Sequence, residues 1–99
     1  KDAAADAHAH RMEELLRRAA RAFAARPDER AMFEHLVRVL DVALDAPFGV
    51  DVAAVQDIVF RVGVGERASQ RTRASAGDEE ARAWQDAFVR LCERLRIRP

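Results

Sequence analysis

Apolar residues in the first quarter of the chain recur with the spacing of a helix. They lie at offsets of 0, 3, 4, 7 and 11: Met12, Leu15, Leu16, Ala19 and Phe23. This spacing places all of them on one face of an α-helix. Pro27 follows, and a proline ring disfavours helical geometry in the residue before it. The pattern predicts an amphipathic helix over residues 5–26.

A second stripe begins directly after Pro27. The same helical spacing returns in five apolar residues: Phe33, Leu36, Val37, Leu40 and Leu44. Pro27, Asp28 and Glu29 supply the fixed φ and the negative charge that favour a helix N-terminus. We therefore expect a second helix that ends near Ala46, before Pro47.

Residues 46–60, "APFGVDVAAVQDIVF", are rich in Val, Ile and Phe and suit either a strand or a buried helix. Strict alternation of apolar and polar residues covers only the last part, and nothing else in the chain alternates to supply a partner strand. Asp51 is a suitable N-cap, because its carboxylate can accept free backbone N–H groups of a first helical turn. Four valines then share one helical face: Val52, Val55, Val59 and Val62. We interpret the stretch as a helix that ends at Gly63.

The polar stretch 63–77, "GVGERASQRTRASAG", is predicted to be a loop or a short exposed helix. A last helix is expected from Asp78 onwards, with a buried stripe of Trp84, Phe88, Leu91 and Leu95. These elements predict an all-α fold: a small four-helix bundle with one long polar loop before the last helix. Residues 1–99 are expected to form a single helical domain. Because Lys1 is the first residue, we also expect this domain to be a module of a larger protein.

The charge balance changes what partners are expected. Seventeen basic and seventeen acidic residues cancel, so the chain has no excess charge that would attract a polyanion. The single cysteine, Cys92, excludes an internal disulfide and fits a reducing compartment. No apolar run is long enough to span a bilayer. We therefore expect a cytoplasmic protein without a membrane partner.

Four arginines form the one local basic cluster: Arg61, Arg67, Arg71 and Arg73. They are a candidate anion-binding patch for phosphate or nucleic acid. No aromatic residue interleaves with them for base stacking, which disfavours nucleic acid.

Other candidate chemistry is weaker. His8, His10, Glu13 and Glu14 could suggest a metal site, because His10 and Glu14 are four residues apart on one helix face. A closed zinc site needs four ligands and a catalytic one three, so Glu34 and His35 would have to come from the second helix, and solvated histidines near the terminus are the alternative. Cys92 has no histidine near it in sequence to activate a nucleophile. Gln56 and Asp57 are expected to face solvent or to form a hydrogen bond between helices. We therefore assign no catalytic, cofactor-binding or metal-binding residue, and whether the chain is an enzyme stays open.

Two segments, "DVAAVQDIVFRV" and "GDEEARAWQDAFVRLCERLRIRP", resemble the helical C-terminal region of family 57 glycoside hydrolase-like proteins of the α-amylase/α-mannosidase type. The resemblance covers roughly residues 30–99. It implies an accessory helical module, since the catalytic carboxylates of that family lie in a barrel domain that this chain lacks. We expect a non-catalytic interaction domain whose partner is a neighbouring protein domain or a second copy. Such a domain would expose an apolar patch on the second or the third helix.

Overall fold

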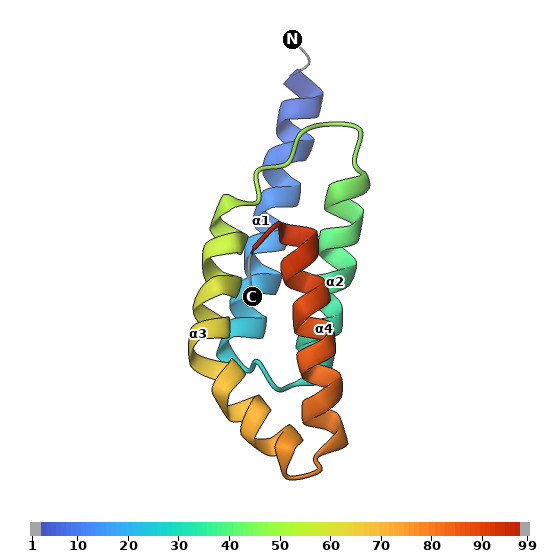
Figure 1. Ribbon diagram of the computed structural model, residues 1–99. Coiled ribbons are helices and arrows are strands. Elements are labelled where there is room, and N and C mark those ends of the chain that lie inside the picture. Colours follow the sequence, from blue (N-terminus) through green and yellow to red (C-terminus); the bar gives the residue numbers. More distant parts are fainter. Residues whose placement is uncertain (1–2, 98–99) are drawn as a thin grey trace. The chain divides into compact units, whose positions relative to one another are not determined.

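The computed structural model describes residues 3–97 and is built from helices (Figure 1). In chain order the elements are α1 (Ala3–Ala25), α2 (Arg30–Asp45), α3 (Ala53–Ser75) and α4 (Glu79–Leu95). No strand occurs in this described part. The predicted all-α fold class with four helices is therefore confirmed. None of these helices is both long and apolar enough to cross a membrane.

Contacts within the chain divide it into two compact units, Lys1–Val55 and Gln56–Pro99. Helices α1 and α2 belong to the first unit, and α4 belongs to the second. Helix α3 begins in the first unit and continues through the second. The expectation of a single domain over residues 1–99 stays a prediction.

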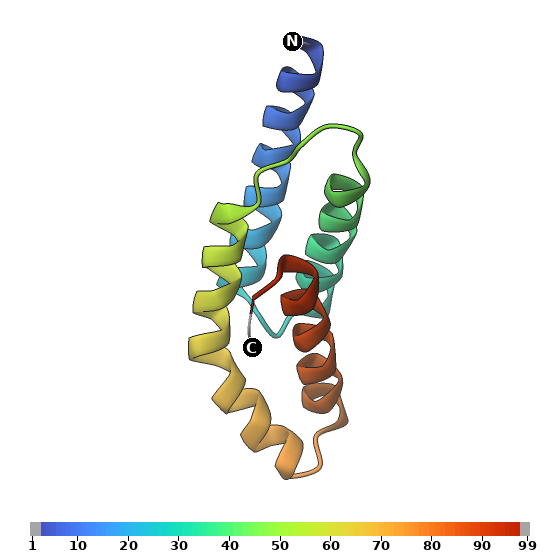
Figure 2. The same cartoon turned by 45° about the horizontal axis from the view of Figure 1, so that its top comes forward.

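In the first unit, α1 and α2 lie side by side as an antiparallel pair (Figures 1 and 2). Their facing sides bury Leu16, Ala19, Ala20 and Phe23 from α1 and Phe33, Leu36, Leu40 and Ala43 from α2. The rings of Phe23 and Phe33 meet between the helices, with centroids 4.8 Å apart. This core uses most of the two predicted stripes, so the period of the apolar residues indicated the covered face of each helix. Leu15 and Leu44, which the spacing also placed on these stripes, are exposed instead.

The connector between α1 and α2 contains Pro27, as predicted, and α1 ends at Ala25. The backbone N–H of Arg26 still donates to the carbonyl of Phe23, at 3.1 Å. Glu29 is the N-cap residue of α2, but its side chain makes no capping hydrogen bond. This helix start therefore leaves its first N–H groups without a side-chain acceptor from the cap.

The start of α3 is held at two points of the first unit. The Asp51 carboxylate accepts a hydrogen bond from the backbone N–H of Ala53 at 2.9 Å, which confirms Asp51 as the predicted cap. The backbone N–H of Asp51 donates to Oε2 of Glu13 on α1 at 2.7 Å. The second bond ties the connector between α2 and α3 to α1, while the first is local to the start of α3.

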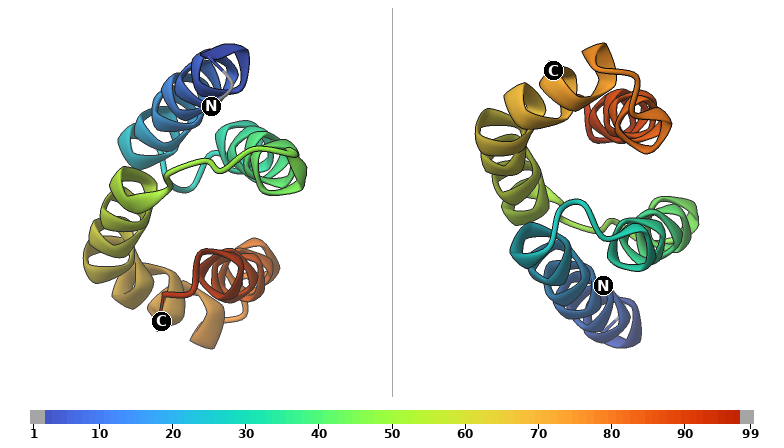
Figure 3. Two further views of the ribbon diagram at one scale, coloured as in Figure 1. Left: turned by 90° about the horizontal axis from the view of Figure 1, so that it is seen from above. Right: turned by 90° about the horizontal axis from the view of Figure 1, so that it is seen from below.

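In the second unit the chain reverses after α3, so that α4 runs antiparallel to it (Figure 1). Figure 3 shows the same two helices from above and from below. Helix α3 buries Val59 and Val62, two members of the predicted valine face. Helix α4 buries Ala81, Trp84, Phe88, Leu91, Cys92 and Leu95. Gln56 donates from Nε2 to the carbonyl of Leu95 at 2.7 Å, which is the predicted hydrogen bond between helices.

The predicted loop over residues 63–77 is wrong. Helix α3 continues without interruption through Ser75, and Gly63 lies inside it. Polarity and two glycines suggested a loop, yet residues 66–74 are mostly strong helix formers such as Glu66, Arg67 and Ala68. Local bonds support the helix, including one from Oγ1 of Thr72 to the carbonyl of Ala68 at 3.0 Å. The polar residues mark an exposed surface of a helix.

The reversal between α3 and α4 is built from Gly77 and Asp78. Gly77 has a φ of +97°, a conformation that a residue with a side chain rarely adopts. The N–H of Asp78 donates to the carbonyl of Arg73 at 3.0 Å, and that of Gly77 to Ala74 at 3.1 Å, the bond pair of a Schellman motif. The Asp78 carboxylate then accepts the N–H groups of Glu80 and Ala81. One short turn thus ends α3 and caps α4.

Candidate functional site

The second unit carries an apolar groove between α3 and α4, with a volume of about 130 Å³. Its lining residues are Phe60, Gly63, Val64, Arg67, Phe88, Cys92 and Ile97. Phe60 and Val64 lie one turn apart on α3 and are 54% and 71% exposed. These are large exposures for apolar side chains beside a concave surface, and they make the groove the main candidate site.

Gly63 leaves room on α3 for the Phe88 ring of α4 at the groove. A Cβ atom on Gly63 would lie 3.0 Å from Cζ and 3.1 Å from Cε2 of Phe88. The Phe88 ring is also stacked on Trp84, with centroids 4.8 Å apart and planes inclined by 7°. The buried ring therefore has little freedom to move, and the missing side chain of Gly63 creates the space that the ring fills.

The C-terminal end of α4 places Ile97 at the groove. Arg96 adopts a left-handed conformation, with φ of 58°, directly after the helix. The backbone N–H of Ile97 then donates to the carbonyl of Cys92 at 2.8 Å, while that of Arg96 donates to Glu93. This is a second Schellman motif, and its residues Ile97 and Cys92 both line the groove.

Cys92 forms part of the groove wall but is a poor nucleophile. Burial raises the pKa of its thiol above the usual value, and the nearby Arg67 guanidinium lowers it by a smaller amount. The thiol therefore stays protonated at neutral pH, and the thiolate is the reactive form. The groove lining contains no carboxylate or imidazole beside it.

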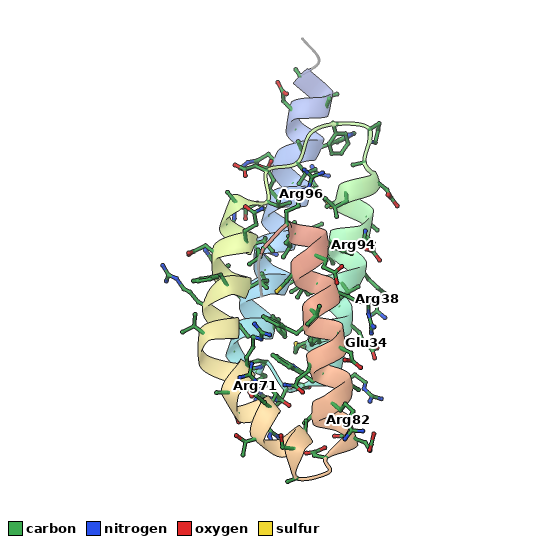
Figure 4. The ribbon with its side chains drawn as sticks, viewed as in Figure 1. Glu34, Arg38, Arg71, Arg82, Arg94 and Arg96 are labelled. Atoms are coloured by element: carbon green, nitrogen blue, oxygen red, sulfur yellow. The ribbon has the colours of Figure 1, made fainter. Side chains whose placement is uncertain are left out.

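The four arginines of the candidate anion-binding patch lie on α3 but not on one face. Relative to Arg67, Arg71 is about 40° around the helix, whereas Arg61 and Arg73 are each about 120° away on opposite sides. Arg61 pairs with Asp57 at 3.2 Å, and Arg73 pairs with Glu66 at 3.4 Å. Only Arg67 and Arg71 lie on one face of α3 and form no ion pair within the described residues. Figure 4 labels Arg71 on α3.

A polar stripe extends the buried valine face, and sequence reasoning missed it. Gln70 is only 2% exposed, and its Nε2 donates to Oε1 of Glu66 at 3.0 Å. The same Glu66 oxygen accepts from Arg73. Val62, Glu66, Gln70 and Arg73 are spaced by four, four and three residues, which is helical spacing and was the available signal. These groups satisfy one another, so the stripe is a closed polar cluster with a structural role.

The histidines and carboxylates of α1 that suggested a metal site have other neighbours in the described residues. Glu14 pairs with Arg17, whose hydrogen bond and charge lower the pKa of the Glu14 carboxyl. His8 lies against Phe48, with ring centroids 6.0 Å apart. Within residues 3–97, no group of three or more potential metal ligands converges.

The first unit also exposes large apolar side chains, namely Leu15 on α1 and Val42 and Leu44 on α2. Val42 is the most exposed of these, at 59%. The expected exposed apolar residues are therefore present on both α2 and α3, and those on α3 border the groove described above.

Comparison of the chain with models of protein families, with curated proteins and with solved structures found no significant match. The functional interpretation therefore depends on the geometry and chemistry of the groove.

Proposed function

We propose that the chain is a non-catalytic helical interaction domain that acts through contact with another protein. One observation carries this proposal. Phe60 and Val64 expose more than half of their surface one turn apart, beside an apolar groove of about 130 Å³. The groove lining offers no acid, base or reactive thiolate, so its chemistry suits docking better than a reaction.

The burial of Phe60 and Val64 by a partner gives an estimate of their contribution to the binding free energy. Covering a fully exposed Val or Phe is worth about 1.5–3 kcal/mol. Because Phe60 and Val64 are already partly covered, burying what remains of both contributes about 2–4 kcal/mol. This is too little by itself for a tight complex, since association also costs translational and rotational freedom. A partner must therefore add further contacts around the groove.

A photocrosslinking experiment tests the docking role. Photoreactive benzoylphenylalanine replaces Phe60, or replaces Arg90 as a control on the opposite side of α4, in cells that normally make the chain. We expect crosslinking to one protein from position 60 and none from position 90. The captured protein is then purified and titrated against the wild-type chain and against Val64→Glu. A loss of affinity of at least about tenfold in the variant is expected.

Two results of this experiment contradict the docking role. The first is equal crosslinking from positions 60 and 90, which would show that the contacts are not specific to the groove. The second is unchanged affinity in Val64→Glu when circular dichroism shows that the variant retains its helices.

The resemblance of residues 30–99 to the C-terminal region of family 57 glycoside hydrolase-like proteins extends the proposal to the parent protein. In this extended proposal the chain is an accessory module of a carbohydrate-processing enzyme and packs against its neighbouring domain. The cytoplasmic location expected from the single cysteine belongs to the same proposal. Sequencing of the gene upstream of the codon for Lys1 should reveal a catalytic domain, and an initiation codon directly before Lys1 would contradict it.

A second candidate function is the binding of phosphate or nucleic acid. Arg67 and Arg71 support it, because they share one face of α3 and form no ion pair in the described part of the chain. The ion pairs of Arg61 and Arg73 count against a four-arginine site. An electrophoretic shift at low salt that disappears in Arg67→Ala/Arg71→Ala would support this candidate, and no shift would dismiss it.

A further inference from the structure

The volume of the groove limits what it can hold. A buried cavity of about 150 Å³ accepts a benzene molecule, and drug-sized ligands occupy pockets of about 300–1,000 Å³. The groove measures about 130 Å³ and opens to solvent. It therefore has room for one large apolar side chain, such as leucine or phenylalanine, and is too small for a nucleotide cofactor or a drug-sized ligand.

The charge that borders the groove is positive. Arg67 is the only charged residue among the seven that line it. Arg71 follows one turn later on the same face of α3. Neither guanidinium has an ion pair among residues 3–97, in contrast to Arg61 and Arg73, which are occupied by Asp57 and Glu66. The apolar groove is therefore bordered by one cation, Arg67, and a second, Arg71, follows it on α3; both are available to a carboxylate.

The apolar groove and the arginines beside it together indicate which chemical groups a partner would present. A guanidinium binds a carboxylate through two parallel hydrogen bonds, and this pairing strengthens when apolar groups exclude water around it. The side chain of Arg67 borders the same apolar surface as Phe60 and Val64. A carboxylate that docks there would thus be partly shielded, unlike one in an exposed surface pair.

We infer that the groove binds an acidic segment of another protein, in which one large apolar side chain enters the groove and an Asp or Glu about one helical turn away pairs with Arg67. Arg71 provides a second contact for a further acidic residue. The inference rests on the proposed docking function and names the partner's chemistry. Residues three or four apart on a helix lie about 5–6 Å from each other, so an amphipathic acidic helix can present both groups at once.

A selection from a library of random helical peptides tests this inference. The selection is run against the wild-type chain and against Arg67→Glu, and enriched peptides are synthesised and titrated. We expect the wild-type chain to enrich peptides with an apolar residue and an acidic residue one turn apart. The Arg67→Glu variant should bind these peptides at least about tenfold more weakly and should instead enrich peptides with a basic residue at the acidic position.

Two matched variants separate the contributions of charge and groove. Arg90→Glu makes the same charge change at an exposed position on the opposite side of α4 and should leave peptide affinity unchanged. Val64→Glu places a charge at the groove and should abolish binding of every selected peptide. Circular dichroism and the emission of Trp84, the only tryptophan, verify that each variant is folded.

Different negative results of these binding measurements contradict different parts of the proposal. If Val64→Glu abolishes binding but the selected peptides are neutral and tolerate Arg67→Glu, the acidic partner is wrong and the docking function stands. If the peptides bind Val64→Glu as well as wild type, both ideas fail. Binding of an oligonucleotide that depends on Arg67, or a dimer in the ultracentrifuge that dissociates in Val64→Glu, would replace the acidic segment with nucleic acid or with a second copy.

Discussion

The two helical pairs each contain an aromatic ring pair at the same centroid distance, 4.8 Å, but in different places. Phe23 and Phe33 come from α1 and α2, so their rings fill the space between two helices. Trp84 and Phe88 both come from α4 and stack along that one helix. In the second unit the opposite helix must therefore accept the ring, and Gly63 provides the space. In the second unit Gly63 and Phe88 also line the apolar groove.

The two pairs also differ in how their helices are joined. The second unit uses Gly77 with positive φ and the doubly accepting carboxylate of Asp78. The first unit uses Pro27, and the cap residue Glu29 makes no side-chain capping bond. The joint in the second unit thus has a side-chain cap, whereas the joint in the first is held by backbone bonds such as that from the N–H of Glu29 to the carbonyl of Arg26 at 3.1 Å, and by the Arg26–Glu29 ion pair.

The largest expected effect comes from removing either core ring. Phe23→Ala and Phe88→Ala should each lower the free energy of unfolding by about 3–5 kcal/mol, because both rings are buried and each deletion leaves a cavity. Urea titration followed by circular dichroism measures this change. Only Phe88→Ala removes the ring stacked on Trp84, so it should also shift the Trp84 emission in the folded state. A loss below about 1 kcal/mol in Phe88→Ala would show that the groove side of this core is loosely packed.

The role of Gly63 is tested by comparison with Gly65 in the same helix. A Cβ on Gly65 meets no atom within 4 Å, so Gly65→Ala should stabilise the chain by about 0.5–1 kcal/mol through helix propensity. Gly63→Ala gains the same propensity but clashes with Phe88, and we expect a net loss of about 1 kcal/mol. Urea titration of both variants gives the difference.

A double mutant sharpens this test. In the Phe88→Ala background the clash is gone, so Gly63→Ala should become stabilising, as at Gly65. Equal effects of Gly63→Ala with and without the Phe88 ring would show that Gly63 is not needed to accommodate that ring.

Substitutions at the two helix caps should change the free energy of unfolding by smaller amounts and in opposite directions. Asp78→Ala removes the acceptor for two N–H groups and should cost about 1 kcal/mol. Glu29→Asp introduces a favoured cap side chain where the backbone is already extended, with φ of −83° and ψ of 114°, and should gain about 0.5 kcal/mol. Thermal unfolding of both variants measures the two shifts. A loss of stability in Glu29→Asp would mean that the Arg26–Glu29 ion pair matters more than the cap.

The smallest effect is expected at the end of α4. Arg96 holds a left-handed conformation that glycine adopts without strain, so Arg96→Gly should stabilise the chain by about 0.5 kcal/mol. The melting temperature should rise by a few degrees. Gly77→Ala is the reciprocal control, because it places a side chain in the same kind of conformation and should lower the melting temperature.

The helical stripes could be predicted because each one depends only on residues close in sequence. The stripe of α1, the cap at Asp51 and the end of α1 before Pro27 all follow from local spacing and local hydrogen bonding. The candidate site was less predictable. Phe60, Val64 and Arg67 belong to α3, whereas Phe88, Cys92 and Ile97 lie far along the chain, and no local pattern relates the two sets.

The sequence by itself determined that this protein is made of helices and which faces of them are covered, since propensity and the period of apolar residues act within a few turns. Only the tertiary structure decided the role of Gly63. Glycine is compatible with a helix end and with a helix interior, so the local sequence left both open. In the structure the helix-forming residues after Gly63 extend α3, and the missing side chain of Gly63 leaves room for the Phe88 ring beside the groove that Arg67 borders.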